Sequence, residues 1–343
     1  MPRNRAGSDW AINGREFLSI RCLFGYKDVL FYVLIGGRER GKSYIVEDFC
    51  LNRSKKGDRL AWMRVSVNSI KKMIANNADK MFDADLVRKY DLELKTKGND
   101  VYNRGGKICS CFALSEMAKW KGVALFDNED DSWLNIVLDE FNPEYGLGGE
   151  KRTQDVVYNF INMVENLARS KKEKMRIFLI ANQLEECSDL LLAFNFLPED
   201  YGIFYLKKKR AVIYNIPNGH AYEKRRRGTV ADILGGDRYR TFSNALDVDM
   251  TRIYKGRLTK PTRLLHFGNN IKYVLWDDAV ISEWKGEKVK NVIAMRPYID
   301  GVEFIPDLRD RVFELFDLRK FMYRTLICQK KFKRDLSLLK PRK

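Results

Sequence analysis

A glycine-rich turn between an apolar run and a helix-like segment constrains this sequence most. The run DVLFYVLI (residues 28–35) is almost continuously apolar and rich in β-branched and aromatic residues, which predicts a buried strand. The turn IGGRERGKS follows, and KSYIVEDFCLNRS then places apolar residues at helical spacing before Gly57 ends the helix. A buried strand that enters a helix through glycines predicts an α/β unit with a parallel sheet.

The turn fits the pattern of a phosphate-binding loop, Gly36-x4-Gly41-Lys42-Ser43. In such a loop backbone amides surround the β-phosphate, Lys42 contacts the β- and γ-phosphates, and the Ser43 hydroxyl ligates Mg²⁺. The residues expected to bind ATP are Gly36, Gly37, Arg38, Glu39, Arg40, Gly41, Lys42 and Ser43. Because the backbone cradles the phosphates, we expect the three charged side chains to face outward, toward a neighbouring subunit or the protein's own sheet; for Glu39 the sequence offers no role.

A second motif, NIVLDE (residues 135–140), predicts a buried strand that ends in two carboxylates. Asp139 would hold the Mg²⁺ shell, and Glu140 would orient the attacking water as general base. Taken alone, the motif fits equally well a strand that exits into an acidic loop. Asp127 is a weaker candidate, since an acidic turn follows it. An acid directly after the Mg²⁺ aspartate, together with the extra strand RLAWMRV (residues 59–65), indicates the additional-strand class of phosphate-loop ATPases, which contains motors, helicases and translocases.

Two further residues follow from the expected topology. The strand KMRIFLIAN ends on Asn182, which would face the γ-phosphate, although an asparagine also simply caps strands. Arg169 ends the preceding helical segment and could reach a neighbouring subunit's nucleotide as an arginine finger. The alternative for Arg169 is a solvated cap at a helix C-terminus.

The chain of 343 residues carries a net charge of +17, which favours a polyanionic partner. Cys109 and Cys111 have the wrong spacing for a zinc site, and the two histidines are distant in sequence. No apolar run approaches the roughly 18 residues that span a bilayer, and the N-terminus lacks a signal-peptide pattern, so we expect no membrane partner.

After about residue 200 the sequence becomes basic and then alternates in short strand-like runs. We predict a phosphate-loop ATPase domain over 1–204, a linker or small helical subdomain over 205–245 and an α+β domain over 246–343, with one long C-terminal helix from Asp307. The basic clusters of the last two segments are plausible phosphate contacts, although a solvated face explains each of them singly. The carboxylates of the last domain are too scattered to predict a two-metal nuclease site; they are Asp277, Asp278, Glu283 and Asp300.

Together these motifs resemble those of the encapsidation proteins, the DNA-packaging motor ATPases of small podoviruses. The resemblance rests on VLIGGRERGKSY, KKGDRLAWMR, IVLDEF, NLARSKKEKMRIFLIAN and EKRRRGTVADILGGDRY, and it is weaker in the C-terminal half. It implies an ATPase that uses ATP and Mg²⁺, followed by a ribonuclease-H-like domain that has lost its acids.

The resemblance also implies partners and residue roles. It implies a homo-oligomeric, pentameric ring in the host cytoplasm, transiently at the portal vertex of the prohead, which drives double-stranded DNA inward and can dock on a structural packaging RNA. Arg169 falls on the family's arginine finger and Asn182 on its coupling asparagine. Arg64 matches an arginine that ends the second strand, and we expect it among the nucleotide-binding residues. Val65 follows it, so the arginine-pair character of the family is missing there, and Lys71 and Lys72 are only candidates for an assisting lysine. The alternatives are a terminase-like protein with an active nuclease and a non-motor nucleic-acid-binding protein.

Overall fold

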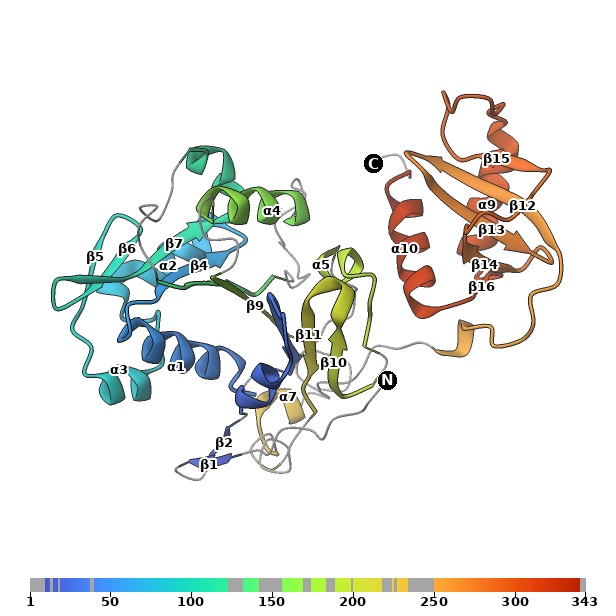
Figure 1. Cartoon of the computed structure of the whole chain (residues 1–343). Helices are drawn as coiled ribbons and strands as arrows, with labels where there is room; N and C mark the ends of the chain where they lie inside the picture. Colours follow the sequence, from blue (N-terminus) through green and yellow to red (C-terminus); the bar gives the residue numbers. More distant parts are fainter. Residues whose placement is uncertain are drawn as a thin grey trace. The chain divides into compact units, whose positions relative to one another are not determined.

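The computed structural model divides the chain into two compact units, Met1–Phe194 with Pro198–Asp247, and Asn195–Leu197 with Val248–Lys343. The structure describes residues 10–12, 15–17, 19–37, 40–122, 132–141, 156–168, 174–182, 189–198, 200–217, 224, 227–233 and 250–339. Each unit is built around its own sheet (Figure 1).

The first unit is organised by a nine-stranded, mostly parallel sheet. In spatial order its strands are β10 (Gly202–Leu206), β11 (Ala211–Asn215), β3 (Phe31–Gly36), β9 (Met175–Asn182), β8 (Leu134–Asp139), β4 (Arg59–Arg64), β7 (Gly106–Ala113), β6 (Asp100–Asn103) and β5 (Leu94–Lys97). The strands from β11 to β7 run parallel, and antiparallel hairpins form both edges. The predicted parallel α/β fold is confirmed.

The strand order brings the predicted motifs to one edge of this sheet. β9 lies between β3, which leads into the glycine-rich turn, and β8, which ends at the two acids. In the register Gly36 pairs with Asn182, and Asp139 pairs with Ile180. Because neighbouring parallel strands point the same way, the turn, the acids and Asn182 all follow carboxyl ends at this edge.

Helices cover both faces of the sheet because side chains alternate along its buried strands. Tyr32 and Leu34 of β3 belong to the core under the first three helices, whereas Val33 and Ile35 are buried outside that cluster. The helices are α1 (Lys42–Ser54), α2 (Val67–Ala78), α3 (Ala84–Tyr90), α4 (Val156–Leu167), α5 (Asp189–Ala193) and α7 (Val230–Ile233). In Figure 1, α1 and α3 lie on one side of β9 and α4 on the other.

Short elements complete this unit. They are the hairpin β1 (Trp10–Ile12) and β2 (Arg15–Phe17) and the 3-10 turns η1 (Arg21–Gly25), η2 (Leu114–Trp120) and η3 (Lys207–Lys209). The basic stretch from residue 205, which we placed in a linker, is part of the sheet instead: residues 207–210 are the turn between β10 and β11, and β11 pairs in parallel with β3. The sequence did not predict these two strands because each has only five residues and the basic turn Lys207–Lys209 separates them.

The second unit is a smaller α+β fold. Its five-stranded sheet has the order β15 (Val292–Ala294), β12 (Pro261–Gly268), β13 (Ile271–Trp276), β14 (Val280–Glu283) and β16 (Met322–Tyr323). The turn η5 (Met250–Arg252) precedes it, and α9 (Pro306–Asp317) and α10 (Leu326–Ser337) follow the strands. Phe332 of α10 packs into an aromatic cluster with Phe267, Tyr273 and Phe321.

The single long C-terminal helix that we expected is wrong. Arg319 adopts φ +55°, which ends the helical path after α9, and β16 follows. Thr325 then caps a new helix, its side chain accepting a hydrogen bond from the Cys328 backbone N–H. Within the described residues, no helix has the length and apolar character to cross a bilayer.

Candidate nucleotide-binding site

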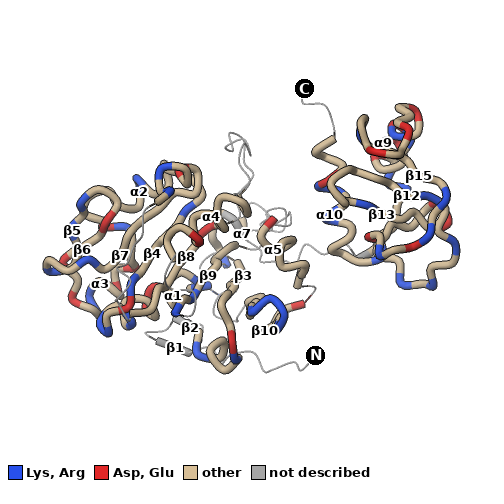
Figure 2. The backbone as a smooth tube through the Cα atoms, turned by 45° about the horizontal axis from the view of Figure 1, so that its top comes forward, with Lys and Arg blue, Asp and Glu red and all other residues tan. Residues whose placement is uncertain are grey.

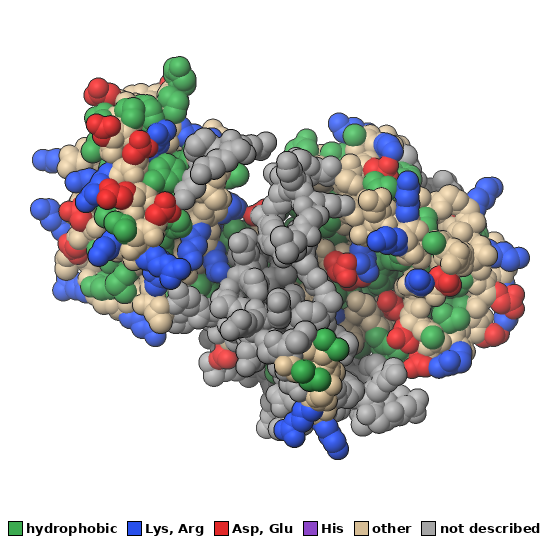
Figure 3. All heavy atoms as spheres, turned by 180° about the vertical axis from the view of Figure 1, so that it is seen from behind, with side chains coloured by type: hydrophobic (Ala, Val, Ile, Leu, Met, Phe, Trp, Pro, Cys, Tyr) green, Lys and Arg blue, Asp and Glu red, His purple; other side chains and the backbone are tan. Residues whose placement is uncertain are grey.

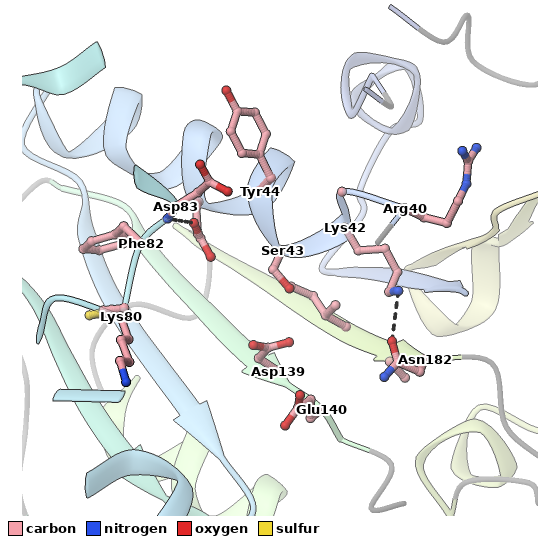
Figure 4. Close-up of a pocket in the computed structure, with 15 residues that line it drawn as sticks. Arg40, Lys42, Ser43, Tyr44, Lys80, Phe82, Asp83, Asp139, Glu140 and Asn182 are labelled. Atoms are coloured by element: carbon pink, nitrogen blue, oxygen red, sulfur yellow. Dashed lines mark hydrogen bonds between the residues drawn. The ribbon is translucent and has the colours of Figure 1, made fainter. Parts of the chain in front are cut away.

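A cavity of about 500 Å³ opens at the edge of the sheet where the motifs converge (Figure 4). Its walls are residues 40–44 at the start of α1, residues 80–83 between α2 and α3, residues 139–140 after β8 and residues 180–182 of β9. Glu47, one turn further along α1, completes the lining. The cavity therefore combines the N-terminus of a helix with carboxylates and an amide, as a nucleotide phosphate site requires.

Gly41 and Gly36 occupy positions where a side chain would be strained or crowded. Gly41 precedes α1 with φ +74°, a conformation in which a side chain is strained. A Cβ at Gly36 would lie 3.0 Å from the Cβ of Ile216, just beyond β11. The close packing of β11 against β3 therefore favours glycine at position 36.

Lys42 is buried and bonded to oxygens at the base of the cavity. Its Nζ donates to the backbone oxygens of Gly36 (3.1 Å) and Gly37 (2.6 Å) and to Oδ1 of Asn182 (3.2 Å). Asn182 thus contacts the loop lysine across the β3–β9 pair, which supports its expected place beside the phosphates.

Ser43, at the start of α1, and Asp139, at the end of β8, both line the cavity (Figure 4). A serine hydroxyl and a carboxylate are the hard oxygen ligands that Mg²⁺ takes, usually alongside water and substrate phosphates. Asp139 is almost fully buried, and this burial raises the pKa of its carboxyl, opposed by the charge of Arg64. The residues present fit a bound Mg²⁺, whose charge would lower that pKa again.

Arg64, at the end of β4, pairs with both acids. Its Nη2 lies 2.6 Å from Oδ2 of Asp139, and its Nη1 donates to Oε2 of Glu140. We expected Arg64 among the nucleotide-binding residues, but it is not part of the cavity lining and holds the carboxylates instead. Glu140 itself adopts φ +53°, an uncommon conformation for a non-glycine residue and one that occurs at functional sites.

Glu47 is a site residue that the motifs did not reveal. Its side chain is buried, and its Oε2 accepts a hydrogen bond from the backbone N–H of Asp83 at 3.0 Å. Burial raises the pKa of Glu47 to about 8. The sequence could have indicated Glu47 through its position four residues after Ser43, on the helix face that also buries Cys50.

The outcome differs among the other predicted residues. Arg38, Glu39, Asp127 and Arg169 fall outside the described residues. Arg40 is 2% exposed and turns its guanidinium away from Lys42, so it is buried within its own subunit (Figure 4). Lys71 and Lys72 are exposed on α2 and do not line the cavity. Among described residues, no group of three potential metal ligands exists, including the scattered C-terminal acids.

Comparison with known proteins gives a consistent result. A family model described as Podovirus DNA encapsidation protein (Gp16) matches residues 15–273. The Phi-28 gp11 DNA packaging motor superposes with a TM-score of 0.66 at 15% identity, covering 95% of this chain and 99% of that one. The bacteriophage Phi-29 genome packaging motor assembly contains a chain with a TM-score of 0.65 at 19% identity, covering 93% and 99%. No curated protein matches the sequence.

Proposed function

Because the chain belongs to the podovirus DNA encapsidation protein family, we propose that it is an ATP hydrolase that drives double-stranded DNA into a viral prohead. The observation that carries the proposal is the cavity in which Lys42, Ser43, Asp139, Glu140 and Asn182 converge. The prohead portal and the DNA are its proposed partners, and the portal vertex in the host cytoplasm is its proposed place of action.

Each of these residues that line the cavity has a proposed role in ATP hydrolysis. Lys42 releases the backbone oxygens of Gly36 and Gly37 and binds the β- and γ-phosphates instead. Ser43 and Asp139 would hold Mg²⁺, which would neutralise charge at the phosphates. Glu140 accepts the proton of the attacking water. In the structure that carboxylate is bonded to Arg64, so Arg64 must share or release it before Glu140 can act as a base.

Arg169 is proposed to act on a neighbouring subunit. It lies between α4, which ends at Leu167, and β9, which begins at Met175. Lys174 accepts a backbone hydrogen bond from Leu134, at the amino end of β8. The cavity lies at the other end of β9, eight residues or roughly 25 Å away. The amino end of β9, where the described chain resumes after residue 173, is therefore the end away from the cavity of the same subunit. From the resemblance to the family we propose that Arg169 acts across an interface, in a ring of subunits that is pentameric by resemblance.

Substitution of the loop lysine and the general base tests the enzyme. Lys42→Ala should abolish nucleotide binding, whereas Glu140→Gln should bind ATP but lose turnover by about 100-fold or more. The measurements are steady-state ATPase and equilibrium binding of ATPγS. Near-normal turnover in both variants would contradict an ATPase at this site.

Mixed oligomers test the action across the interface. Arg169→Ala and Lys42→Ala subunits are each expected to be inactive alone. Mixing them should restore part of the ATPase activity, because an intact loop can then meet an intact arginine from its neighbour. Absence of rescue at every mixing ratio argues for action within one subunit or for no role of Arg169.

A further inference from the structure

The segment between α2 and α3 forms a wall of the cavity that none of the motifs above contains. Residues 80–83 line the cavity opposite Lys42, with Asp139 and Glu140 between the two sides (Figure 4). Lys80 is the cation of this wall, and within the part of the chain that the structure describes it makes no hydrogen bond or ion pair. A lysine ammonium next to a phosphate site is a charge available to a ligand.

The backbone before Lys80 is held in an unusual conformation. Asn76, Asn77 and Ala78 have φ angles of +52°, +59° and +60°, so three consecutive non-glycine residues are left-handed. Such a run costs on the order of 1 kcal/mol for each residue and persists only where the surroundings fix it. Its effect is to end the path of α2 and direct the chain to the cavity.

Buried side chains fix the segment on both sides of Lys80. Ala78, Met81 and Phe82 are 0%, 3% and 4% exposed and belong to the core under α1 to α3. The Asp83 side chain caps α3 by accepting from the Asp85 N–H at 2.9 Å. With its neighbours anchored in this way, Lys80 is an exposed side chain on a fixed backbone.

Glu47 joins this wall to the phosphate-loop helix. Its Oε2 accepts a hydrogen bond from the Asp83 N–H at 3.0 Å. Glu47 lies on α1, one turn after Ser43, so this bond joins the first turns of α1 to the segment that carries Lys80. A buried carboxyl group needs such a partner, since an unsatisfied one is costly. The bond therefore fixes the distance between the wall that carries Lys80 and the loop that carries Lys42.

We propose that Lys80 binds the γ-phosphate of ATP from the side opposite Lys42, and that Glu47 is the positioning residue that holds Lys80 there. This inference rests on the proposed function of the site. It deepens that function by adding a contact that distinguishes ATP from ADP, since ADP lacks the γ-phosphate. Burial raises the pKa of Glu47 to about 8, so near neutral pH its carboxyl is largely protonated and glutamine is its closest mimic.

The experiment measures binding of ATPγS and of ADP, each with Mg²⁺, to the full-length protein by titration calorimetry. Lys80→Met should weaken ATPγS binding about tenfold and change ADP binding by less than about twofold, as expected for one lost charge-assisted contact. Glu47→Ala should show the same selective loss, and Glu47→Gln, which keeps an acceptor oxygen for Asp83, should restore wild-type values. Lys72→Met, an exposed lysine outside the cavity, is the matched control and should change neither affinity.

Other outcomes overturn the inference. Unchanged ATPγS affinity in Lys80→Met shows that Lys80 is only a solvated surface lysine, and equal losses for both nucleotides remove the γ-phosphate assignment. Selective loss in Lys80→Met but not in a folded Glu47→Ala refutes the positioning role; thermal melts establish folding. The Lys42→Ala variant separates this test from the proposed function. If Lys42→Ala binds both nucleotides normally, the nucleotide site itself is misassigned. If Lys42→Ala binds neither nucleotide and Lys80→Met binds both normally, only the present inference fails.

Discussion

At the scale of single residues, the guanidinium of Arg64 bonds both Asp139, the proposed Mg²⁺ ligand, and Glu140, the proposed general base. It contacts Asp139 and Glu140 with two different nitrogens, and this geometry suits a planar fork rather than an ammonium. The sequence predicted all three residues but not their contact, because the pairing depends on β4 lying beside β8.

The Arg64 fork leads to a prediction for a charge-conserving substitution. Arg64→Lys should lower ATPase turnover at least about tenfold, because one ammonium cannot bond both carboxylates in the same way. The measurement is steady-state ATPase at saturating ATP. Arg59→Lys, at the exposed start of the same strand, is the control and should retain turnover. Equal activity of both variants would mean that charge alone suffices at position 64.

The buried carboxyl of Glu47 predicts how stability depends on pH. Its pKa in the folded state is raised to about 8 from about 4.5, so the folded form favours the protonated acid. This contribution is fully present below pH 4.5 and is lost as pH rises toward 8. Glu47→Gln should therefore be more stable than the wild type at pH 8, by about 1–3 kcal/mol, with little difference near pH 5. Denaturant titrations at the two pH values measure this, and a pH-independent difference would contradict it.

At the scale of elements, the sequence predicted best where local pattern and tertiary role agree. The buried strands β3, β8 and β9 are continuous apolar runs, and the sequence predicted each of them as a strand. Prediction failed where a few residues decide the path. Arg319 splits the expected C-terminal helix, and the short strands β10 and β11 join the sheet through the pairing of β11 with β3. Hydrophobic periodicity predicts neither the helix break at Arg319 nor the pairing of these short strands.

The left-handed residues at the end of α2 predict a difference between two substitutions at one position. Asn77 is exposed with φ +59°, a conformation that glycine and asparagine tolerate and β-branched residues do not. Asn77→Val should lower the free energy of unfolding by about 1–2 kcal/mol, whereas Asn77→Gly should stay within about 0.5 kcal/mol. Chemical denaturation gives both values. A tolerated valine would show that this turn relaxes without cost.

At the scale of the whole molecule, positive charge is concentrated in the second part of the chain. Residues 250–343 contain 22 Lys and Arg against 11 Asp and Glu, which is most of the net charge of +17. Lys and Arg occur throughout the tube of the second unit in Figure 2, and Figure 3 shows their side chains on its visible face, interspersed with acids. We therefore expect the second unit to supply many of the phosphate contacts to DNA.

Salt dependence tests this distribution of charge. Lys288 and Lys290 are exposed in the loop between β14 and β15. If both contact phosphates, replacing them by glutamine should reduce the slope of log K against log salt concentration by about two. The measurement is binding to duplex DNA of mixed sequence over a salt series. Arg311→Gln, which removes a cation already paired with Glu314, is the control and should leave the slope unchanged.

The contacts of Lys42 have a consequence for a repeating cycle. Its ammonium bonds Gly36, Gly37 and Asn182, so the side chain proposed to bind the phosphates also joins the end of β3 to the end of β9. An arriving nucleotide replaces oxygens around one nitrogen and does not have to assemble the site. Repeated turnover along a DNA molecule would then exchange the partners of one ammonium group and leave the two strand ends that it joins in place.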